Sequence, residues 1–361
     1  MGAKTFAGWL LICAMLAGNF GCSGDNGGGG SSAAHTAYVT LAAGNSIAAF
    51  QVNQGALRAV VGAPFSAGPS PVSIVAHPSG KFVYVANAAE NDISLFNVDS
   101  STRELKEVMP RTPAGTSPNA LAIDSAGSFL YAANRLSNNI SVYSINSGDG
   151  TLQEVSGSPV PTGLAPISLL LTPSNKYLYV ASGNLGEVFG YSVNSGGLQS
   201  VPTSPFSAGG NPFGLAVDPG EHFLYATNFS EKTVTGLSIN QATGSLSIIP
   251  GFPVTVETTP VAALVHPSGK YLYVVNLGSN NVSAFTLDAT GLATALTTGA
   301  TTSVGTQPLF IVSNASGGTI YVGNQGSKTI TQLTVDASTG QLTSTATTNL
   351  NSAPSSMVLL N

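Results

Sequence analysis

The stretch PVSIVAHPSGKFVYVAN, residues 71–87, is the unit from which most of this chain is built. Its tyrosine recurs seven times at intervals of 46, 47, 48, 46, 48 and 48 residues, each time within a short apolar run. The seven positions are Tyr38, Tyr84, Tyr131, Tyr179, Tyr225, Tyr273 and Tyr321. A period of this length is typical of repeat arrays, and four short strands per unit favour a propeller over a helical solenoid.

Each unit predicts four strands. A proline opens the first strand, and the second strand carries the tyrosine. A third strand such as ISLFNV (93–98) runs into an Asp or Asn, and in six units a glycine follows, which is a hairpin signal. The fourth strand is more polar, as in LKEV (105–108), and is expected at the outer edge. The opening prolines are Pro71, Pro118, Pro166, Pro212, Pro260, Pro308 and Pro354.

The turn between the first two strands requires a residue in the left-handed conformation. Glycine supplies it in HPSG (77–80), and Asn175 replaces that glycine in one unit because asparagine tolerates positive φ. Glu221 does not suit this position, so we expect Gly220 to take the role in its unit.

The two ends of the chain complete one unit between them. Nothing before Tyr38 supplies a first strand, whereas PSSMVLL (354–360) is a first strand with no unit after it. Pairing the two ends would remove two open sheet edges. The predicted fold is therefore all-β: residues 36–361 form a seven-bladed β-propeller of four-stranded blades, closed by its N- and C-terminal strands.

The N-terminus predicts export. Lys4 and the apolar run of residues 6–18 are typical of a signal peptide over residues 1–21, too short for a comfortable membrane span. The sequence before Cys22 is similar to a bacterial lipobox, although Asn19 stands where leucine is usual. We expect a lipid on Cys22, a Gly/Ser-rich tether over residues 22–35, and anchoring in the cell envelope, with the outer membrane favoured because no Asp follows Cys22. The alternative is an ordinary cleaved signal with an incidental cysteine.

The amino-acid composition limits the kinds of partner and cofactor that the protein could bind. Charged residues make up only 7% of the chain, with 11 Lys+Arg against 16 Asp+Glu, so no basic stripe exists to bind nucleic acid. Both cysteines, Cys13 and Cys22, precede the propeller, which excludes disulfides and thiolate metal sites within it. No His/Asp/Glu cluster has metal-ligand spacing, so we expect no metal and no cofactor. We also expect a monomer.

Seven loops should converge on the face where the chain enters each first strand and passes from the second to the third strand, and ligands commonly bind there. On this top face the candidate ligand-binding residues are Asn119, Asn211, Gln307 and Gln325. Glu90 and Arg135 are the candidate catalytic pair, because they occupy corresponding loops of adjacent blades. The alternative is a surface ion pair worth about 0–1 kcal/mol. The other charged candidates are Asp92, Glu187, Glu231, Lys232 and Lys328.

Two sets of polar residues are expected to be structural. Five second strands end in asparagine, and identity at equivalent positions favours turn residues that bond their own backbone over a ring of ligands. His77 and His266 fall in the turn on the opposite face, where a capping role is expected. The five asparagines are Asn87, Asn134, Asn228, Asn276 and Asn324.

The repeat resembles the seven-bladed lactonase propellers, which include 6-phosphogluconolactonase-like proteins, and the related YVTN-repeat surface proteins. The resemblance covers residues 36–361 and rests on the proline, the SGK turn and the YVAN strand. It implies Arg-His after a leading-loop proline and Glu-Leu after a second-strand Asn, groups that would hold a phosphate or carboxylate and activate water. Here no histidine follows any of the prolines, and no Glu follows these asparagines.

Two functions are therefore expected. The first is a cell-envelope lipoprotein whose propeller is a binding module for a glycan, peptide or protein on its top face. The alternative is a lactone hydrolase, a carboxylic-ester hydrolase resembling 6-phosphogluconolactonase with a non-standard active site. Missing Arg-His and Asn-Glu pairs favour the first.

Lipid anchoring is testable at one residue. Replacing Cys22→Ser removes the thiol that would carry the lipid, so it should abolish incorporation of labelled fatty acid and release the protein from membranes. Metabolic labelling followed by fractionation measures both effects. Labelling that survives the substitution would point to another anchor.

Overall fold

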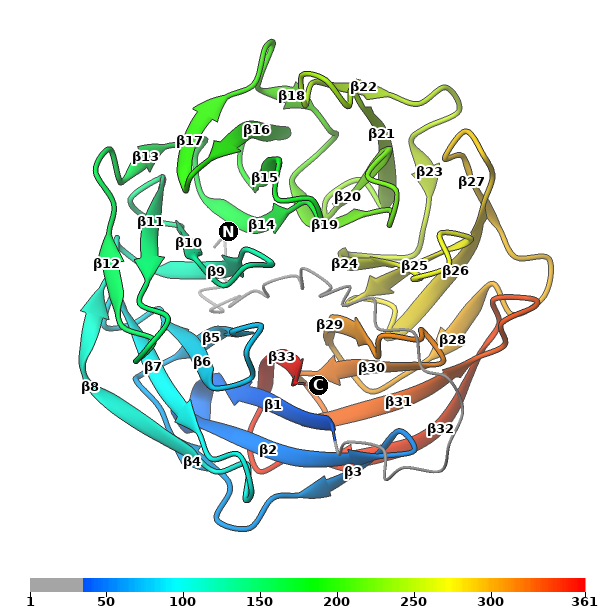
Figure 1. Ribbon diagram of the computed structural model, residues 1–361. Coiled ribbons are helices and arrows are strands. Elements are labelled where there is room, and N and C mark those ends of the chain that lie inside the picture. Colours follow the sequence, from blue (N-terminus) through cyan, green and yellow to red (C-terminus); the bar gives the residue numbers. More distant parts are fainter. Residues whose placement is uncertain (1–34, 361) are drawn as a thin grey trace, which may run out of the picture.

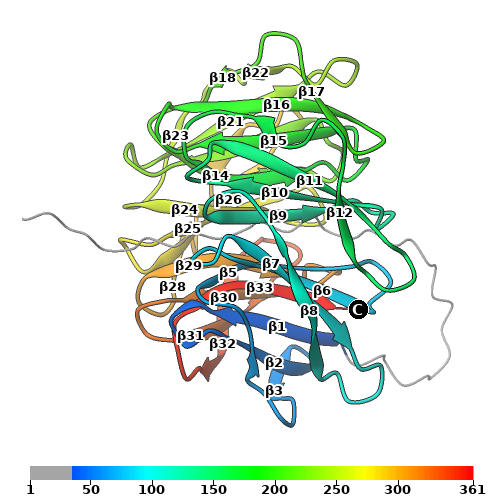
Figure 2. The same ribbon diagram turned by 90° about the vertical axis from the view of Figure 1, so that its left-hand side faces the viewer.

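Seven antiparallel sheets stand around a central axis in the computed structural model, which describes residues 35–360 (Figure 1). Viewed from the side, neighbouring sheets pack face against face (Figure 2). The predicted seven-bladed β-propeller is confirmed. The predicted signal peptide and Cys22 lie outside the described residues. Within residues 35–360 no helix is long and apolar enough to cross a bilayer.

The innermost strands line the axis, and each begins at one of the seven prolines. They are β5 (Pro71–Ala76), β9 (Pro118–Ile123), β14 (Pro166–Leu171), β19 (Pro212–Val217), β24 (Pro260–Val265), β29 (Pro308–Ser313) and β33 (Pro354–Leu360). The second strands carry the tyrosines. They are β1 (His35–Leu41), β6 (Phe82–Asn87), β10 (Phe129–Asn134), β15 (Tyr177–Ser182), β20 (Phe223–Asn228), β25 (Tyr271–Asn276) and β30 (Thr319–Asn324).

The third strands are β2 (Ser46–Asn53), β7 (Asp92–Val98), β11 (Asn139–Ile145), β16 (Glu187–Asn194), β21 (Thr233–Ile239), β26 (Asn281–Leu287) and β31 (Thr329–Val335). The outer strands are β3 (Ala56–Ala59), β8 (Leu105–Pro113), β12 (Leu152–Glu154), β17 (Gly197–Ser200), β22 (Leu246–Ile248), β27 (Ala293–Ala295) and β32 (Leu342–Asn349). In five blades the outer edge is broken, and a second short piece also pairs with the third strand. These pieces are β4 (Phe65–Ser66), β13 (Val160–Pro161), β18 (Phe206–Ser207), β23 (Val254–Thr255) and β28 (Thr301–Ser303). A short 3-10 helix, η1 (Ala42–Gly44), joins β1 to β2.

Blade 1 is the one built from both ends of the chain, and blades 2 to 7 follow in sequence order. Its sheet has the order β3-β2-β1-β33, so the C-terminal strand is innermost. β1 and β33 run antiparallel, with Thr36 opposite Leu360 and Leu41 opposite Pro354. The pairing of N- and C-terminal strands predicted from the sequence is confirmed, and it gives β1 a partner strand on each side.

The core lies between adjacent sheets. The innermost and second strands are buried along nearly their whole length, as in β5 and β6, because each sheet has a neighbour on both faces. The repeated tyrosines are fully buried, and burial raises the pKa of each phenol above its ordinary value of 10.0, that of Tyr321 to about 12. These side chains therefore stay neutral hydrogen-bond donors.

Six of the seven tyrosine hydroxyls cross to the next blade. Each donates to a backbone carbonyl in the hairpin between the third and fourth strands of that blade, at 2.7–2.9 Å. The donor–acceptor pairs are Tyr38–Arg103, Tyr84–Gly150, Tyr179–Gly244, Tyr225–Gly291, Tyr273–Gly340 and Tyr321–Gly55. The hydroxyl of Tyr131 has no hydrogen-bond partner. The repeated tyrosine thus joins blade to blade, including blade 7 to blade 1.

The turn on the opposite face corrects one expectation. Asn175 has the predicted positive φ of 61°, but in the neighbouring blade Glu221 itself adopts φ 58°, and Gly220 does not take this role. The carboxylate of Glu221 accepts hydrogen bonds from the backbone N–H and the hydroxyl of Ser174 in blade 4, the latter at 2.6 Å. These bonds offset the strain of a left-handed glutamate, which sequence spacing alone did not indicate.

The tyrosine contact predicts a difference between two equivalent substitutions. Tyr225→Phe removes a buried hydroxyl and leaves the carbonyl of Gly291 without its donor, so it should lower the free energy of unfolding by about 1 kcal/mol. Tyr131→Phe removes a buried hydroxyl that has no partner, so it should be neutral or stabilising. Urea unfolding of both variants measures this. Equal losses in the two would show that the hydroxyl–carbonyl bond does not hold the blades together.

Candidate functional site

The top face of the ring carries the loops that lead into the innermost strands and the loops joining second to third strands. The bottom face carries the tight turns between innermost and second strands and the hairpins between third and fourth strands. This division follows from the antiparallel order of each sheet. The candidate residues Glu90, Arg135, Asn211, Gln307 and Gln325 belong to top-face loops or stand at their ends.

A ring of irregular residues surrounds the axis just below the top face. In every blade the register between the innermost and second strands shifts beside the opening proline, which leaves the following residue outside the ladder. These bulge residues are Val72, Asn119, Ile167, Phe213, Val261, Leu309 and Ser355, and none is more than 6% exposed. Bulges commonly re-aim side chains next to active sites, so this ring is the first place to look for chemistry.

The two polar bulge residues contact backbone carbonyl groups of the next blade. The side-chain amide of Asn119 donates to the backbone carbonyl of Ile167 in the next blade at 2.8 Å. The hydroxyl of Ser355 lies 2.7 Å from the carbonyl oxygen of Pro71 in blade 2. The structure therefore places the candidate ligand residue Asn119 in the interior, 1% exposed.

The five other bulge residues are apolar and close the top of the axis. Phe213 stacks on Phe229, with ring centroids 5.3 Å apart. Ile167, Phe213, Val261 and Leu309 belong to one buried cluster that runs through blades 4 to 7 and into blade 1. Aliphatic and aromatic side chains offer neither a proton-transfer group nor an anion ligand. In these five blades the first of the two positions at which the resemblance implies Arg-His therefore holds a packing residue.

The leading loops are fixed by their backbones. Six residues before the prolines have φ between 50° and 59° although none is glycine. They are Ser70, Ser117, Ala165, Asn211, Thr259 and Gln307. Each carbonyl accepts the N–H of the residue that follows the second strand; Gln325 donates to Gln307 at 2.8 Å in this way. Asn211 and Gln307 have exposed side chains and Gln325 is half-buried, so these three sequence candidates line the top face, in blades 5 and 7.

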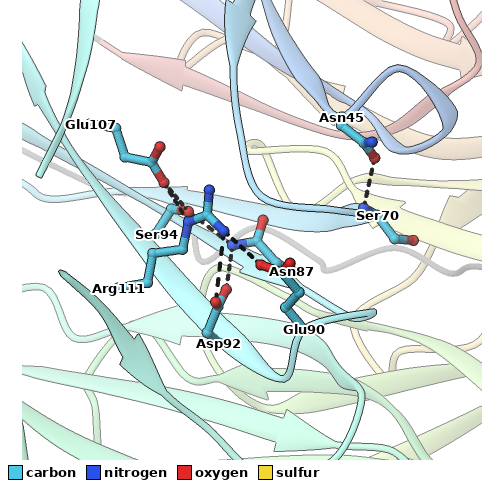
Figure 3. Close-up of polar contacts among 8 residues, drawn as sticks. All are labelled: Asn45, Ser70, Asn87, Glu90, Asp92, Ser94, Glu107 and Arg111. Atoms are coloured by element: carbon cyan, nitrogen blue, oxygen red, sulfur yellow. Dashed lines mark hydrogen bonds and ion pairs between the residues drawn. The ribbon is translucent and has the colours of Figure 1, made fainter. Parts of the chain in front are cut away.

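Four asparagines that the sequence reasoning missed organise this face. Asn45, Asn91, Asn138 and Asn280 adopt left-handed conformations just before or at the start of a third strand. Each side-chain oxygen accepts the backbone N–H of the leading-loop residue in the next blade at 2.8–3.0 Å, as Asn45 does from Ser70 (Figure 3). The signal was present in the sequence, since each of these asparagines precedes a branched apolar residue by two positions. Gly186, Lys232 and Lys328 replace it in the other turns.

The asparagines that end five second strands are fully buried, as a structural role requires. Their partners differ from those expected. Each side-chain nitrogen donates to two side-chain oxygens of its own third strand, five and seven residues ahead, as Asn87 does to Asp92 and Ser94. Both donor positions are occupied, so these amides are not available to a ligand as donors.

Glu90 has a different partner from the one predicted. Its carboxylate lies 2.7 Å from the guanidinium of Arg111, which also contacts Glu107 at 2.7 Å and Asp92 at 3.8 Å (Figure 3). The hydroxyl of Ser94 donates to the same Glu107 oxygen. Arg111, rather than the expected Arg135, is therefore the ion-pair partner that the structure gives Glu90. The whole network lies within blade 2, because β8 is long enough to bring Arg111 beside the second-to-third-strand loop.

The remaining charged candidates are dispersed. The backbone N–H of Arg135 donates to Ser117, and its side chain is half-buried. Glu187 is half-buried in blade 4, and Glu231, Lys232 and Lys328 are exposed in blades 5 and 7. No group of three or more His, Cys, Asp or Glu side chains in the described part of the chain could hold a metal ion.

The histidines have the capping role predicted for them. The ring of His77 bonds Ser79 within its turn at 2.7 Å and the carbonyl of Gly127 in the next blade at 3.0 Å. His266 contacts Ser268 at 2.8 Å, and burial lowers the pKa of its imidazole. Both lie on the bottom face, away from the leading loops.

One apolar group is exposed on the top face. Leu136, Leu164 and Leu185 are 67%, 49% and 44% exposed and lie in loops of blades 3 and 4. The loops are contiguous: Thr162, two residues before Leu164, donates to Asn138, two residues after Leu136. The carbonyl of Leu164 accepts the hydroxyl of Ser182, three residues before Leu185. We call these three side chains the leucine group.

The sequence matches the profile of a known family, described as lactonase, 7-bladed beta-propeller, over residues 31–165 and 164–359. The match extends over nearly all of the propeller. The chain belongs to this family of seven-bladed lactonase propellers.

Solved structures with the same architecture include bacterial lactonase-like proteins. A Bacteroides fragilis protein provisionally assigned as a 6-phosphogluconolactonase gives a TM-score of 0.81 at 21% identity, covering 93% of this chain and 100% of its own. A periplasmic gluconolactonase of Pseudomonas aeruginosa gives 0.73 at 20% identity, covering 91% and 99%. At this identity the likeness shows the fold. Among curated proteins, none matches the sequence significantly.

Proposed function

We propose that this protein is a binding module of the cell envelope, which uses the top face of a lactonase-type propeller to hold a partner. The observation that carries the proposal is the ring of bulge residues. All seven are buried, five are apolar, and the other two are bonded between blades. A ring of this kind supports a rigid platform rather than a reaction centre.

Lactone hydrolysis sets chemical requirements that this face meets poorly. A base must activate water, and a donor or cation must stabilise the developing oxyanion. Glu90, the candidate base, is half of a short ion pair with Arg111, and that arginine is shared with Glu107 and Asp92. The carboxylate of Glu90 is thus already in contact with a cation, and a water molecule or substrate would have to displace that contact to use it.

The leucine group favours a peptide or protein over a glycan as the partner. Exposed apolar side chains gathered over a few contiguous loops mark interaction sites on soluble proteins. Around them the top face offers amides and hydroxyls, including the exposed side chain of Asn211. An apolar centre with a polar, weakly charged surround is the usual composition of a protein-binding surface.

The envelope location rests on the sequence of residues 1–22. The periplasmic gluconolactonase of Pseudomonas aeruginosa supports it, as a structural relative that works outside the cytoplasm. Phosphorylated sugar lactones are cytoplasmic metabolites, so an exported protein would not meet them.

Lactone hydrolysis is the second candidate, favoured by family membership. The substrate would be a non-phosphorylated lactone, with Glu90 as base and Arg135 as the cationic partner. Glu90 and Arg135 occupy corresponding loops of blades 2 and 3. For the two to act together on a substrate, Glu90 would have to give up its ion pair with Arg111.

The two functions are separated by a lactone panel. We expect no turnover of gluconolactone-type or simple aliphatic lactones above the uncatalysed rate. Hydrolysis is measured by the release of protons in a weakly buffered solution. Glu104→Gln, a change of an exposed carboxylate on the bottom face, is the matched control for Glu90→Gln and Arg135→Ala. Turnover that disappears in both of these folded variants but persists in Glu104→Gln would establish the hydrolase instead.

The binding surface is tested by removing its apolar centre. The double variant Leu136→Ser and Leu185→Ser should retain its fold but bind an envelope partner roughly tenfold more weakly, which corresponds to about 1.4 kcal/mol. Quantitative mass spectrometry of proteins held by the immobilised propeller measures this. Ile248→Ser is the matched control, because Ile248 is 51% exposed on an outer strand. A partner lost equally from the control would place the binding surface elsewhere.

A further inference from the structure

An apolar cavity of about 530 Å³ surrounds the axis at the bottom face. The ends of all seven innermost strands line it with aliphatic side chains, among them Val75, Ile123, Leu170, Val217 and Leu264. Its lining contains no carboxylate, ammonium or guanidinium group. The volume is within the range of small-molecule sites, roughly 300–1,000 Å³.

The cavity opens at the bottom face, and its lining does not reach the top face. Val217, Leu264 and Leu359 are partly exposed, so solvent reaches the lining from the bottom face. None of the bulge residues belongs to the lining, and each is at most 6% exposed. The lining therefore stops short of the top face, and this cavity, here called the funnel, is separate from the candidate site.

The mouth of the funnel is also weakly polar. Pro78, Pro173, Pro219 and Pro267 from four turns stand around it, together with His77. Both ring nitrogens of His77 already have hydrogen-bond partners, the hydroxyl of Ser79 and the carbonyl of Gly127. The other polar side chains of the lining are Ser125, Ser313 and Asn314, which lie in or beside the bottom-face turns. Deeper in the funnel the lining is aliphatic, so a sugar or a charged metabolite would lose its hydration there without gaining partners, which disfavours binding.

We propose that this funnel binds one aliphatic chain, such as the acyl chain of a fatty acid or lipid, with the polar head at the mouth. Apolar cavities lined by aliphatic side chains stay dry and take up apolar ligands. Seven near-equivalent strands around one axis shape the space for a chain rather than for a flat ring. The site lies opposite the partner-binding face and does not depend on the function proposed for that face.

The start of the propeller places acyl chains within reach. β1 begins at His35 on the bottom face, where Thr36 pairs with the cavity-lining Leu360. Cys22, the expected lipid attachment point, is thirteen positions before His35. That length spans at most about 45 Å when fully extended. The mouth of the funnel would therefore lie near any membrane in which Cys22 is anchored.

The test uses residues 35–361, which include every strand of the ring. A fluorescent polyene fatty acid should bind saturably, one per chain, and palmitate should displace it. Val217→Trp fills the funnel and Leu264→Lys places a charge in it. Because both residues are partly exposed, both variants should fold, as melting curves would verify. Each should weaken binding at least tenfold. Leu185→Lys, on the top face, is the matched control and should bind like the unaltered propeller.

Absence of saturable binding would overturn the proposal, as would binding that is equal in the unaltered propeller and both funnel variants, or a loss that is as large in Leu185→Lys. The lipidated full chain identifies the source of the acyl group. If it excludes the probe while residues 35–361 bind it, the protein's own lipid fills the funnel; if both bind it, the ligand is external. Either result supports an aliphatic site. Val217→Trp should leave partner binding at the top face unchanged, so the two proposals fail independently.

Discussion

A phenol buried between two sheets loses its hydrogen bonds to water, and in six of the seven blades the acceptor that replaces water joins that blade to the next. The acceptor is a carbonyl in the hairpin of the next blade, a position occupied by glycine in five of the six pairs. In blade 3, where a side chain on Gly150 would collide with the ring of Phe82, glycine lets the hairpin approach closely. Neighbouring blades are therefore joined by both packing and hydrogen bonds. These contacts also hold the top face of the ring in a fixed shape.

Belonging to this family determines the fold of the chain, whereas the chemistry of a site depends on the residues at the bulge positions. The proline and the bulge that follows it set the position of one side chain in each of the seven blades. In this chain five of those positions hold buried apolar residues such as Val72, Ile167 and Phe213, and the other two hold Asn119 and Ser355, which bond between blades. Shared architecture with proteins named for lactone hydrolysis therefore fixes where a site would be, while the residues present determine whether it can do chemistry.

The seven blades, their strand order and their closure could be predicted from the sequence because each signal is repeated seven times. Contacts between blades could not, because they depend on residues far apart in the chain. Nothing in the spacing shows that Arg111 on a long outer strand reaches Glu90, or that Ser174 relieves the strain at Glu221. The capping asparagines such as Asn45 were visible as a local pattern, but their partner, the next blade's leading loop, was not.

The split blade also determines when the protein can fold. β33 is the last strand to be synthesised, yet it is the innermost strand of the first blade, and its contact from Thr40 to Ser356 spans 316 positions. Until that strand arrives, β1 presents an unpaired edge to everything around it. On the proposed export route the chain would cross the membrane from its N-terminus, so blade 1 would stay incomplete until β33 had crossed. The ring would then close only after translocation, and the open edge of β1 would be exposed to aggregation during that interval.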